Sequence, residues 1–486
     1  MPKAPESASQ SALGVTSVRL KRARKFTRGQ IIAVLAVSIT VVLVATSQVL
    51  PVQITIVLLG GLAAIALYDR RRILLFTVIM VPSLSLVRRV TAGPAGYTDS
   101  DPLILLPIAL VVAVVIMSWT RPRTDSRQLF VRGAAAAVVV GTVGTIVLRT
   151  SFDVSSLFFA GLLIVPLLLA LSLSTGRLPA VWDMVSSAIP FLAVLAGAYG
   201  IVQFFFLPDW DRAWMITSRL RSIGAPLPLQ VRVFGASESP GPYALFLGLA
   251  ITLCLANAVV AKRVDRRVGW VVVGAFILFP LVLSGVRAAL VGIVVSAVLL
   301  TLVRARGVTR LVFLSFLVGG YALLQAVIGR FGASSSILTS DRYSGFSTQD
   351  DSFIARIDLL RSVGNPLSHI VGNPEAANSD NLYINVLIRY GLVAAVALLV
   401  LVVALVILAI KGLAKGHAET VALSVVFIAV NSLFGPIFDA LFGIVIGIVL
   451  GTIMAGLPGH PAALGPSAQG HLAKSSDKGR RTRQRF

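Results

Sequence analysis

The sequence is poor in the residues that bind metals or form cross-links. Its 486 residues include one cysteine, Cys254, and four histidines. A single thiol excludes both a disulfide within the chain and a thiolate metal cluster, and the scattered histidines show no metal-ligand spacing. These residue types therefore predict no metal site.

Charged residues are also scarce, and more than half of the chain is hydrophobic. Charged residues make up 13% of the chain and hydrophobic residues 56%, with a mean hydropathy of +0.90. Apolar runs repeatedly approach the roughly 20 residues that a helix needs to cross a bilayer. They are continuously apolar rather than alternating, which indicates helices. The sequence predicts an all-α, polytopic integral membrane protein.

Acidic residues are outnumbered by basic ones, 20 to 43, which gives a net charge of +23. The basic clusters lie between apolar runs or near the ends of the chain, as the positive-inside rule describes. We therefore expect them to set orientation and to attract membrane lipids, and we expect no nucleic-acid binding. The clusters are 19–28, 69–72, 121–127, 262–267, 304–310, 411–417 and 478–485.

Placing each basic cluster inside predicts a bundle of about 12 to 14 transmembrane helices with both termini cytoplasmic. The predicted organisation is a basic cytoplasmic tail (1–28), a transmembrane domain (29–456) and a basic disordered tail (457–486). The first apolar run lacks a convincing cleavage site, so we interpret it as a retained helix. The predicted helices are 29–49, 51–68, 73–90, 102–120, 131–149, 155–174, 179–206, 241–261, 269–283, 286–303, 311–329, 382–410, 418–433 and 438–456.

Two long polar segments, 207–241 and 329–381, are predicted on the outer side, the second between the 311–329 and 382–410 helices. Loops of this length usually carry function. Within the second, 351–363 has apolar residues at helical spacing, which favours an amphipathic helix on the membrane surface.

Arg287 stands in an apolar run too long for one span, so we expect a break at Ser284 and Gly285. The break would put Arg287 in the first turn of the next helix, where the helix dipole disfavours a cation. Such an arginine suggests a bound anion; the alternative is an arginine that snorkels to the membrane surface.

Other polar candidates lie within the two outer loops. Arg232 and Glu238 precede the 241–261 helix, and each could be an ordinary loop residue. Arg356 and Arg361 lie on the expected surface helix beside Asp358, where exposed ion pairing is the simpler explanation.

The stretch "SDNLYINVLIRYGL" (379–392) has polar residues at the start of a helix. Asp380 and Asn381 are typical of an N-cap. Arg389 lies about two turns further on and should face a polar cavity or an acid such as Asp439. His369 is interpreted as a polar loop residue.

Three stretches resemble the O-antigen ligase and O-antigen polymerase superfamily, bacterial membrane glycosyltransferases of GT-C type. They are "RVFGASESPGPYA", "LSGVRAALVGIVV" and "ARIDLLRSVGNPLSHIVGNP" with the closing "SDNLYINVLIRYGLVAA". The closing spacing of Asn381, nine residues and Gly391 is similar to the ligase pattern. Asp380 stands where ligases have histidine, which is more similar to the polymerase branch, and Ala394 departs from the pattern.

The resemblance implies a polyprenyl-diphosphate-linked glycan as donor, a glycan as acceptor, and other polysaccharide-assembly membrane proteins as partners. It implies that Arg232, Arg287 and Arg356 hold the diphosphate without metal or cofactor. Asp380, or else Glu238, would position or deprotonate the acceptor hydroxyl. Asn381 and Arg389 would line the acceptor cavity.

The function implied is polymerisation of a cell-surface polysaccharide, O-antigen-like or capsular, on the outer face of the cytoplasmic membrane. A ligase that transfers the glycan to a different final acceptor is the first alternative. A transporter or flippase for lipid-linked sugars is the second, although no inverted repeat is visible.

Overall fold

A computed structural model describes residues 70–93, 102–118, 128–150, 152–175, 178, 181–218, 223–304, 307–331, 354, 358, 361, 363–376, 381–416, 419–435, 437–438 and 441–456. These residues form helices joined by turns and loops, with one isolated bridge between Gly224 and Val231. The elements are α3 (Arg70–Ala92), η2 (Pro102–Leu105), α4 (Leu106–Ser118), α5 (Leu129–Arg149), α6 (Val154–Ser174), α7 (Trp182–Phe206), α8 (Asp209–Thr217), α9 (Pro240–Val260), α10 (Val264–Leu283), α11 (Arg287–Arg304), α12 (Gly307–Phe331), η5 (Pro366–His369), α15 (Leu382–Lys415), α16 (Glu419–Asn431) and α17 (Phe442–Met454).

The prediction of an all-helical fold is confirmed for these residues. Eight of the helices are long and apolar enough to cross a membrane, and four shorter apolar helices accompany them. This is the pattern of a multi-pass membrane protein. The predicted helices 29–49 and 51–68 and both predicted tails lie outside the described residues.

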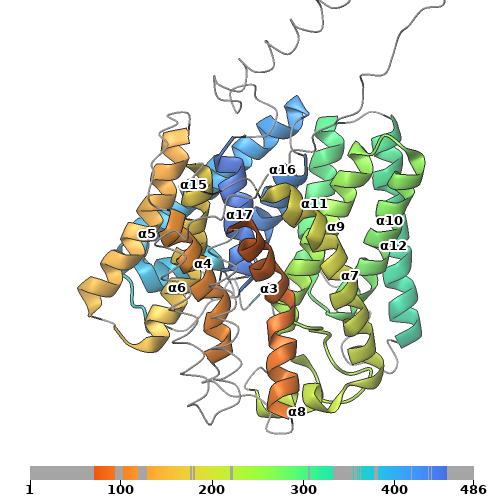
Figure 1. The fold of residues 1–486 in the computed structure, drawn as a ribbon, viewed down its shortest axis with the longest axis horizontal. Coiled ribbons are helices and arrows are strands. Elements are labelled where there is room, and N and C mark those ends of the chain that lie inside the picture. Colours follow the sequence, from red (N-terminus) through yellow and green to blue (C-terminus); the bar gives the residue numbers. More distant parts are fainter. Residues whose placement is uncertain are drawn as a thin grey trace, which may run out of the picture.

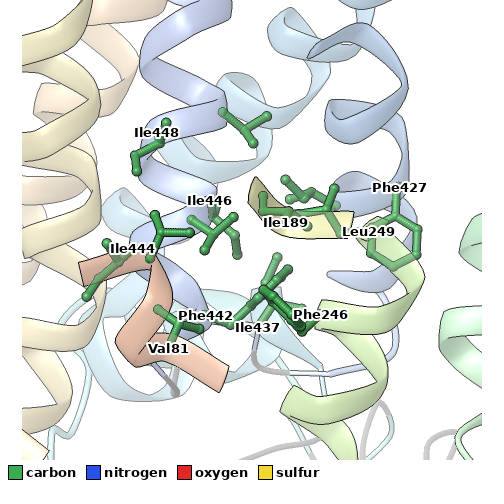
Figure 2. Close-up of a cluster of buried hydrophobic side chains, with 14 of the residues drawn as sticks. Val81, Ile189, Phe246, Leu249, Phe427, Ile437, Phe442, Ile444, Ile446 and Ile448 are labelled. Atoms are coloured by element: carbon green, nitrogen blue, oxygen red, sulfur yellow. The ribbon is translucent and has the colours of Figure 1, made fainter. Parts of the chain in front are cut away.

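The shorter helix α17 forms the centre of the bundle, between α5 at one edge and α12 at the other (Figure 1). All of its residues except Thr452 are buried, which fits a helix that is apolar on every side. Figure 2 shows its isoleucines among side chains of α3, α7, α9 and α16. A Cβ on Gly447 would lie 2.5 Å from the Pro166 carbonyl oxygen of α6. Small residues therefore let these two helices approach closely.

The helix break predicted at Ser284 and Gly285 is confirmed. Helix α10 ends at Leu283, Gly285 adopts φ 65°, and α11 begins at Arg287. A positive φ is favourable for glycine because it has no Cβ.

A second break lies within the predicted 382–410 helix, which the sequence did not indicate. Gly391 in α15 has φ 85° and ψ 174°, so the helix is interrupted there. Thr145 donates a hydrogen bond to the Tyr390 carbonyl oxygen at 2.8 Å, and a Cβ on Gly391 would lie 2.5 Å from the Ile370 carbonyl oxygen. The interruption admits the 370–374 segment against α15.

Several helix termini meet at one end of the bundle, which we call the loop end and define as residues 149–150, 152–153, 207–218, 223–239, 284–287, 363–376 and 381. The 223–239 loop bonds to the C-terminal parts of three helices there. Its backbone N–H groups at Leu229 and Val233 donate to Phe204 and Leu283, and its Ala236 carbonyl accepts from Leu86. Helix α8 and the last turns of α3 lie at the bottom of Figure 1, at this end.

Candidate functional site

A fully buried ion pair anchors the loop end. Arg89 Nε, near the end of α3, lies 2.9 Å from Asp211 Oδ1 of α8, and both side chains are 0% exposed. The second oxygen, Oδ2, accepts hydrogen bonds from Tyr199 Oη at 2.8 Å and Gln203 Nε2 at 2.7 Å. Burial raises the pKa of Asp211, while Arg89 and these two hydrogen bonds lower it. Such partners are what a buried carboxylate requires.

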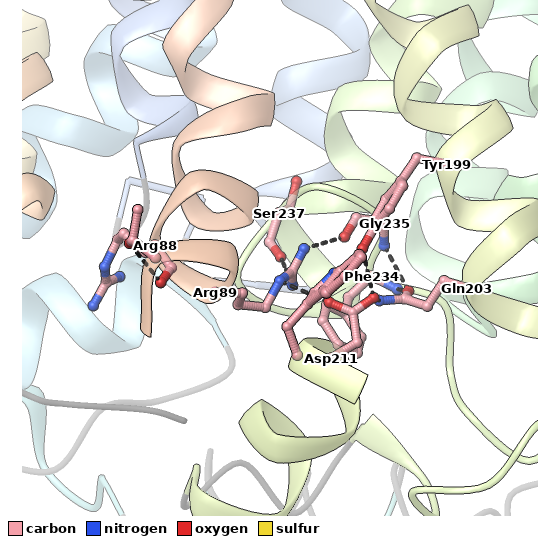
Figure 3. A network of polar contacts seen from close by, with 10 residues as sticks. Arg88, Arg89, Tyr199, Gln203, Asp211, Phe234, Gly235 and Ser237 are labelled. Atoms are coloured by element: carbon pink, nitrogen blue, oxygen red, sulfur yellow. Dashed lines mark hydrogen bonds and ion pairs between the residues drawn. The ribbon is translucent and has the colours of Figure 1, made fainter. Parts of the chain in front are cut away.

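The same side chains fix the loop that leads into α9 (Figure 3). Arg89 donates to the carbonyl oxygens of Gly235 and Ser237. Gln203 Oε1 accepts from the backbone N–H groups of Phe234 and Gly235, both at 2.9 Å. The loop is therefore held by hydrogen bonds to side chains of α3 and α7.

Arg88 points away from its neighbour Arg89 and lines a separate pocket (Figure 3). We call this the Glu238 pocket, because Glu238 shares it with Arg88, Ser85 and Ser237. Its volume is about 30 Å³, room for about one water molecule. Arg88 is only 3% exposed, and among the described residues Ser85 Oγ finds no hydrogen-bond partner.

Glu238 lies just before α9 and is half-buried. Burial raises the pKa of this carboxyl, and the nearby Arg88 and Arg89 lower it in part. A carboxyl with a raised pKa exchanges a proton closer to neutral pH than an ordinary glutamate, as proton transfer in catalysis requires.

Two of the predicted arginines lie at the turn between α10 and α11. Arg232 donates from Nε to the Ser284 carbonyl oxygen at 3.2 Å and from Nη2 to the Gly285 carbonyl oxygen at 3.4 Å. Arg287, two residues after Gly285, is the first residue of α11 and is half-buried. The 223–239 loop thus carries Glu238 to one side of the loop end and Arg232 to the start of α11.

Asn381 caps α15, as predicted. Its Oδ1 accepts from the backbone N–H groups of Tyr383 at 2.9 Å and Ile384 at 3.2 Å. Its Nδ2 donates to the Leu433 carbonyl oxygen, just beyond α16, at 3.0 Å. Asp380, Arg356 and Asp439 lie outside the described residues.

Arg389 lies in the first part of α15 and lines a larger pocket. Its Nε and Nη2 donate to the Pro374 carbonyl oxygen at 3.0 and 2.8 Å, and its guanidinium lies 4.4 Å from the ring centre of Phe159. We call this the Arg389 pocket; its volume is about 270 Å³ and it also exposes Asp153 and Glu375. Its remaining lining residues are Ser155, Ser156 and Ala376.

The remaining candidates have simpler surroundings. His369 lies in the short helix η5, 3.2 Å from the Val363 carbonyl oxygen. Arg361 and Asp358 form an exposed ion pair at 3.4 Å. Within the described ranges, no group of three or more His, Cys, Asp or Glu residues could hold a metal ion.

Sequence reasoning missed Arg88, Arg89 and Asp211. The signal was two adjacent arginines inside an otherwise apolar helix, in "SLVRRVTA", because charges in such a segment need partners. The partner could not be named, since Asp211 lies more than a hundred residues away in the chain.

Comparison of the chain with protein-family models, curated proteins and solved structures finds no match.

Proposed function

We propose that this membrane protein is a glycosyltransferase that polymerises a cell-surface polysaccharide. It would transfer a glycan from a polyprenyl-diphosphate donor to the hydroxyl of an acceptor sugar. The observation that carries the proposal is the 223–239 loop, which places Glu238 beside Arg88 and Arg232 at the turn before Arg287. A carboxylate and guanidinium groups, the two kinds of side chain that this reaction needs, lie at one end of the bundle.

The guanidinium groups would hold the donor diphosphate. Arg287 begins α11, and the positive end of the helix dipole adds to its attraction for an anion. Arg232 approaches the same turn, and Arg356 is proposed to join them from the 329–381 loop. These fixed positive charges would stabilise the polyprenyl diphosphate as it leaves, so the step needs no metal.

The bond changes are those of a single displacement with inversion. The acceptor oxygen forms a bond to the anomeric carbon as the bond from that carbon to the diphosphate oxygen breaks. The electron pair leaves with the polyprenyl diphosphate, and the hydroxyl proton passes to a carboxylate. Asp380 is proposed for this role first and Glu238 second; the raised pKa of Glu238 suits a proton acceptor.

The loop end is proposed to face the outside of the cytoplasmic membrane. The basic clusters around 262–267 and 411–417 border the opposite helix ends, which the positive-inside rule assigns to the cytoplasm. About 12 to 14 spans with both termini cytoplasmic complete the proposed topology.

The test is an in vitro reaction of the full chain in lipid with a polyprenyl-diphosphate oligosaccharide. A ladder of regularly spaced products on a gel is expected, together with its loss in Arg287→Ala. Arg266→Ala, which removes an exposed arginine near the start of α10, is the matched control and should leave the ladder unchanged.

Two other results would replace the proposal. Transfer that requires a separate final acceptor would indicate a ligase. No product with any acceptor, from a donor that another glycosyltransferase consumes, would indicate transport of lipid-linked sugars.

A further inference from the structure

The charged side chains of the Arg389 pocket differ from those of the site proposed for the diphosphate, because they include two carboxylates. Asp153 precedes α6, Glu375 lies in the 363–376 segment, and Arg389 belongs to α15. The two carboxylates are exposed at the surface, while Arg389 is 4% exposed. Three separate parts of the chain thus contribute charged groups to one open pocket of about 270 Å³.

The pocket wall is fixed before any ligand arrives. Arg149, the last residue of α5, donates to the carbonyl oxygens of Gly372 and Val371 at 2.9 and 3.2 Å. The Asn373 N–H donates to the Ile388 carbonyl oxygen at 2.7 Å. Asn373 Oδ1 then accepts from the Glu375 N–H at 3.2 Å. A wall held in this way loses little conformational entropy when a ligand binds.

The charges of the pocket select against anions. Asp153 and Glu375 contribute two negative charges against the single positive charge of Arg389. Arg389 is already engaged with the Pro374 carbonyl oxygen and the Phe159 ring. A phosphate or a uronic acid would therefore meet net repulsion.

The same groups suit a ligand rich in hydroxyl groups. One oxygen of Asp153 accepts from the Ser156 N–H at 2.9 Å, and its carboxylate has a second oxygen that can accept. Glu375 offers two more acceptor oxygens, and the Ser155 hydroxyl can donate or accept. We infer that the Arg389 pocket binds one sugar ring that is neutral or carries an amino group. The inference rests on the proposed function for the source of that sugar, the glycan being transferred.

Ligand-observed NMR tests the pocket directly, by saturation transfer from the full chain in nanodiscs to soluble methyl glycosides. The panel contains neutral hexosides, N-acetylhexosaminides, hexosaminides and a glucuronide. In the wild-type protein we expect a signal from a neutral or amino glycoside and none from the glucuronide. In the double variant Asp153→Asn with Glu375→Gln, that affinity should fall at least about tenfold, because two charge-assisted hydrogen bonds become weaker neutral ones.

The double variant leaves one positive charge in the pocket, so glucuronide binding should appear. Asparagine is also a good N-cap, so α6 should still begin normally. The matched control is Asp183→Asn with Glu419→Gln, which makes the same chemical change in the first turns of α7 and α16. It should keep the wild-type binding pattern.

Equal binding of the neutral glycosides by both double variants would overturn the inference, as would a wild-type preference for the glucuronide or silence across the panel. This readout does not depend on transfer. Glycoside binding without a product ladder would reject the proposed function and keep the pocket. A product ladder from a protein that fails the binding test would keep the proposed function and reject sugar binding in the Arg389 pocket.

Discussion

The Glu238 pocket and the Arg389 pocket contain the same kinds of charged side chain, held in opposite ways. Around the Glu238 pocket, Arg88 and the Arg89–Asp211 pair are almost completely buried. In the Arg389 pocket the arginine is buried but both carboxylates are exposed. The first arrangement depends on side-chain partners inside the protein, and the second on a backbone interruption at Gly391. The charged groups of the first region are therefore enclosed with their partners, whereas the carboxylates of the second remain accessible to a ligand.

The largest expected effect comes from breaking the buried pair. Arg89→Met leaves Asp211 buried without its cation, which should cost about 3–5 kcal/mol of unfolding free energy. The measurement is unfolding in mixed micelles followed by tryptophan fluorescence. Adding Asp211→Leu should recover part of the loss, because no buried charge then remains unpaired. A single variant as stable as the double variant would contradict this account.

The equivalent test of the Arg389 pocket changes Gly391, where the backbone of α15 is interrupted. Gly391→Ala places a side chain at φ 85°, and its Cβ would lie 2.5 Å from the Ile370 carbonyl oxygen. We expect a loss of about 3 kcal/mol in the same unfolding assay.

Gly144→Ala in α5 is the control for Gly391→Ala. A Cβ there meets nothing within 4 Å, so this helical substitution should be neutral or stabilising by about 0.5–1 kcal/mol. Equal effects of the two substitutions would show that the interruption of α15 is not required.

The structural features of the loop end differ in how far the sequence predicted them. The break at Ser284 and Gly285 was predictable because the apolar run around it is too long for one membrane span. The cap at Asn381 was predictable because capping depends on residues next to it in the chain. The interruption at Gly391 was not predictable in this way, since a distant segment, 370–374, causes it.

The Glu238 pocket depends even more on distant contacts. Adjacent side chains in a helix point about 100° apart, so Arg88 and Arg89 must face different surroundings. Which of them would meet Asp211 depends on how the 223–239 loop and α8 pack against α3. Spacing along the chain contains no information about that packing.

A smaller effect is expected at Asn381, which contacts both α15 and the end of α16. Asn381→Ala removes the N-cap acceptor and should cost about 1 kcal/mol. Asn381→Asp keeps an acceptor for the Tyr383 and Ile384 N–H groups but loses the Nδ2 donor to Leu433. The aspartate variant should therefore lie between the alanine variant and the wild type in the unfolding assay. An aspartate variant less stable than alanine would contradict the capping role.

The smallest expected effects are opposite responses to pH, because Glu238 is only half-buried and Asp153 is exposed. Burial raises the pKa of Glu238, so its protonated form is favoured by folding and its stabilising contribution is lost as pH rises through the raised pKa. The N–H of Ser156 lowers the pKa of Asp153, so its contribution is present above the ordinary aspartate pKa of about 3.9 and is lost as pH falls through the lowered value. Unfolding measured from about pH 7 down to about pH 3 should therefore show wild type gaining on Glu238→Gln and losing its advantage over Asp153→Asn. If both differences moved in the same direction, the contrast between a carboxyl whose protonated form folding favours and one whose charged form folding favours would be wrong.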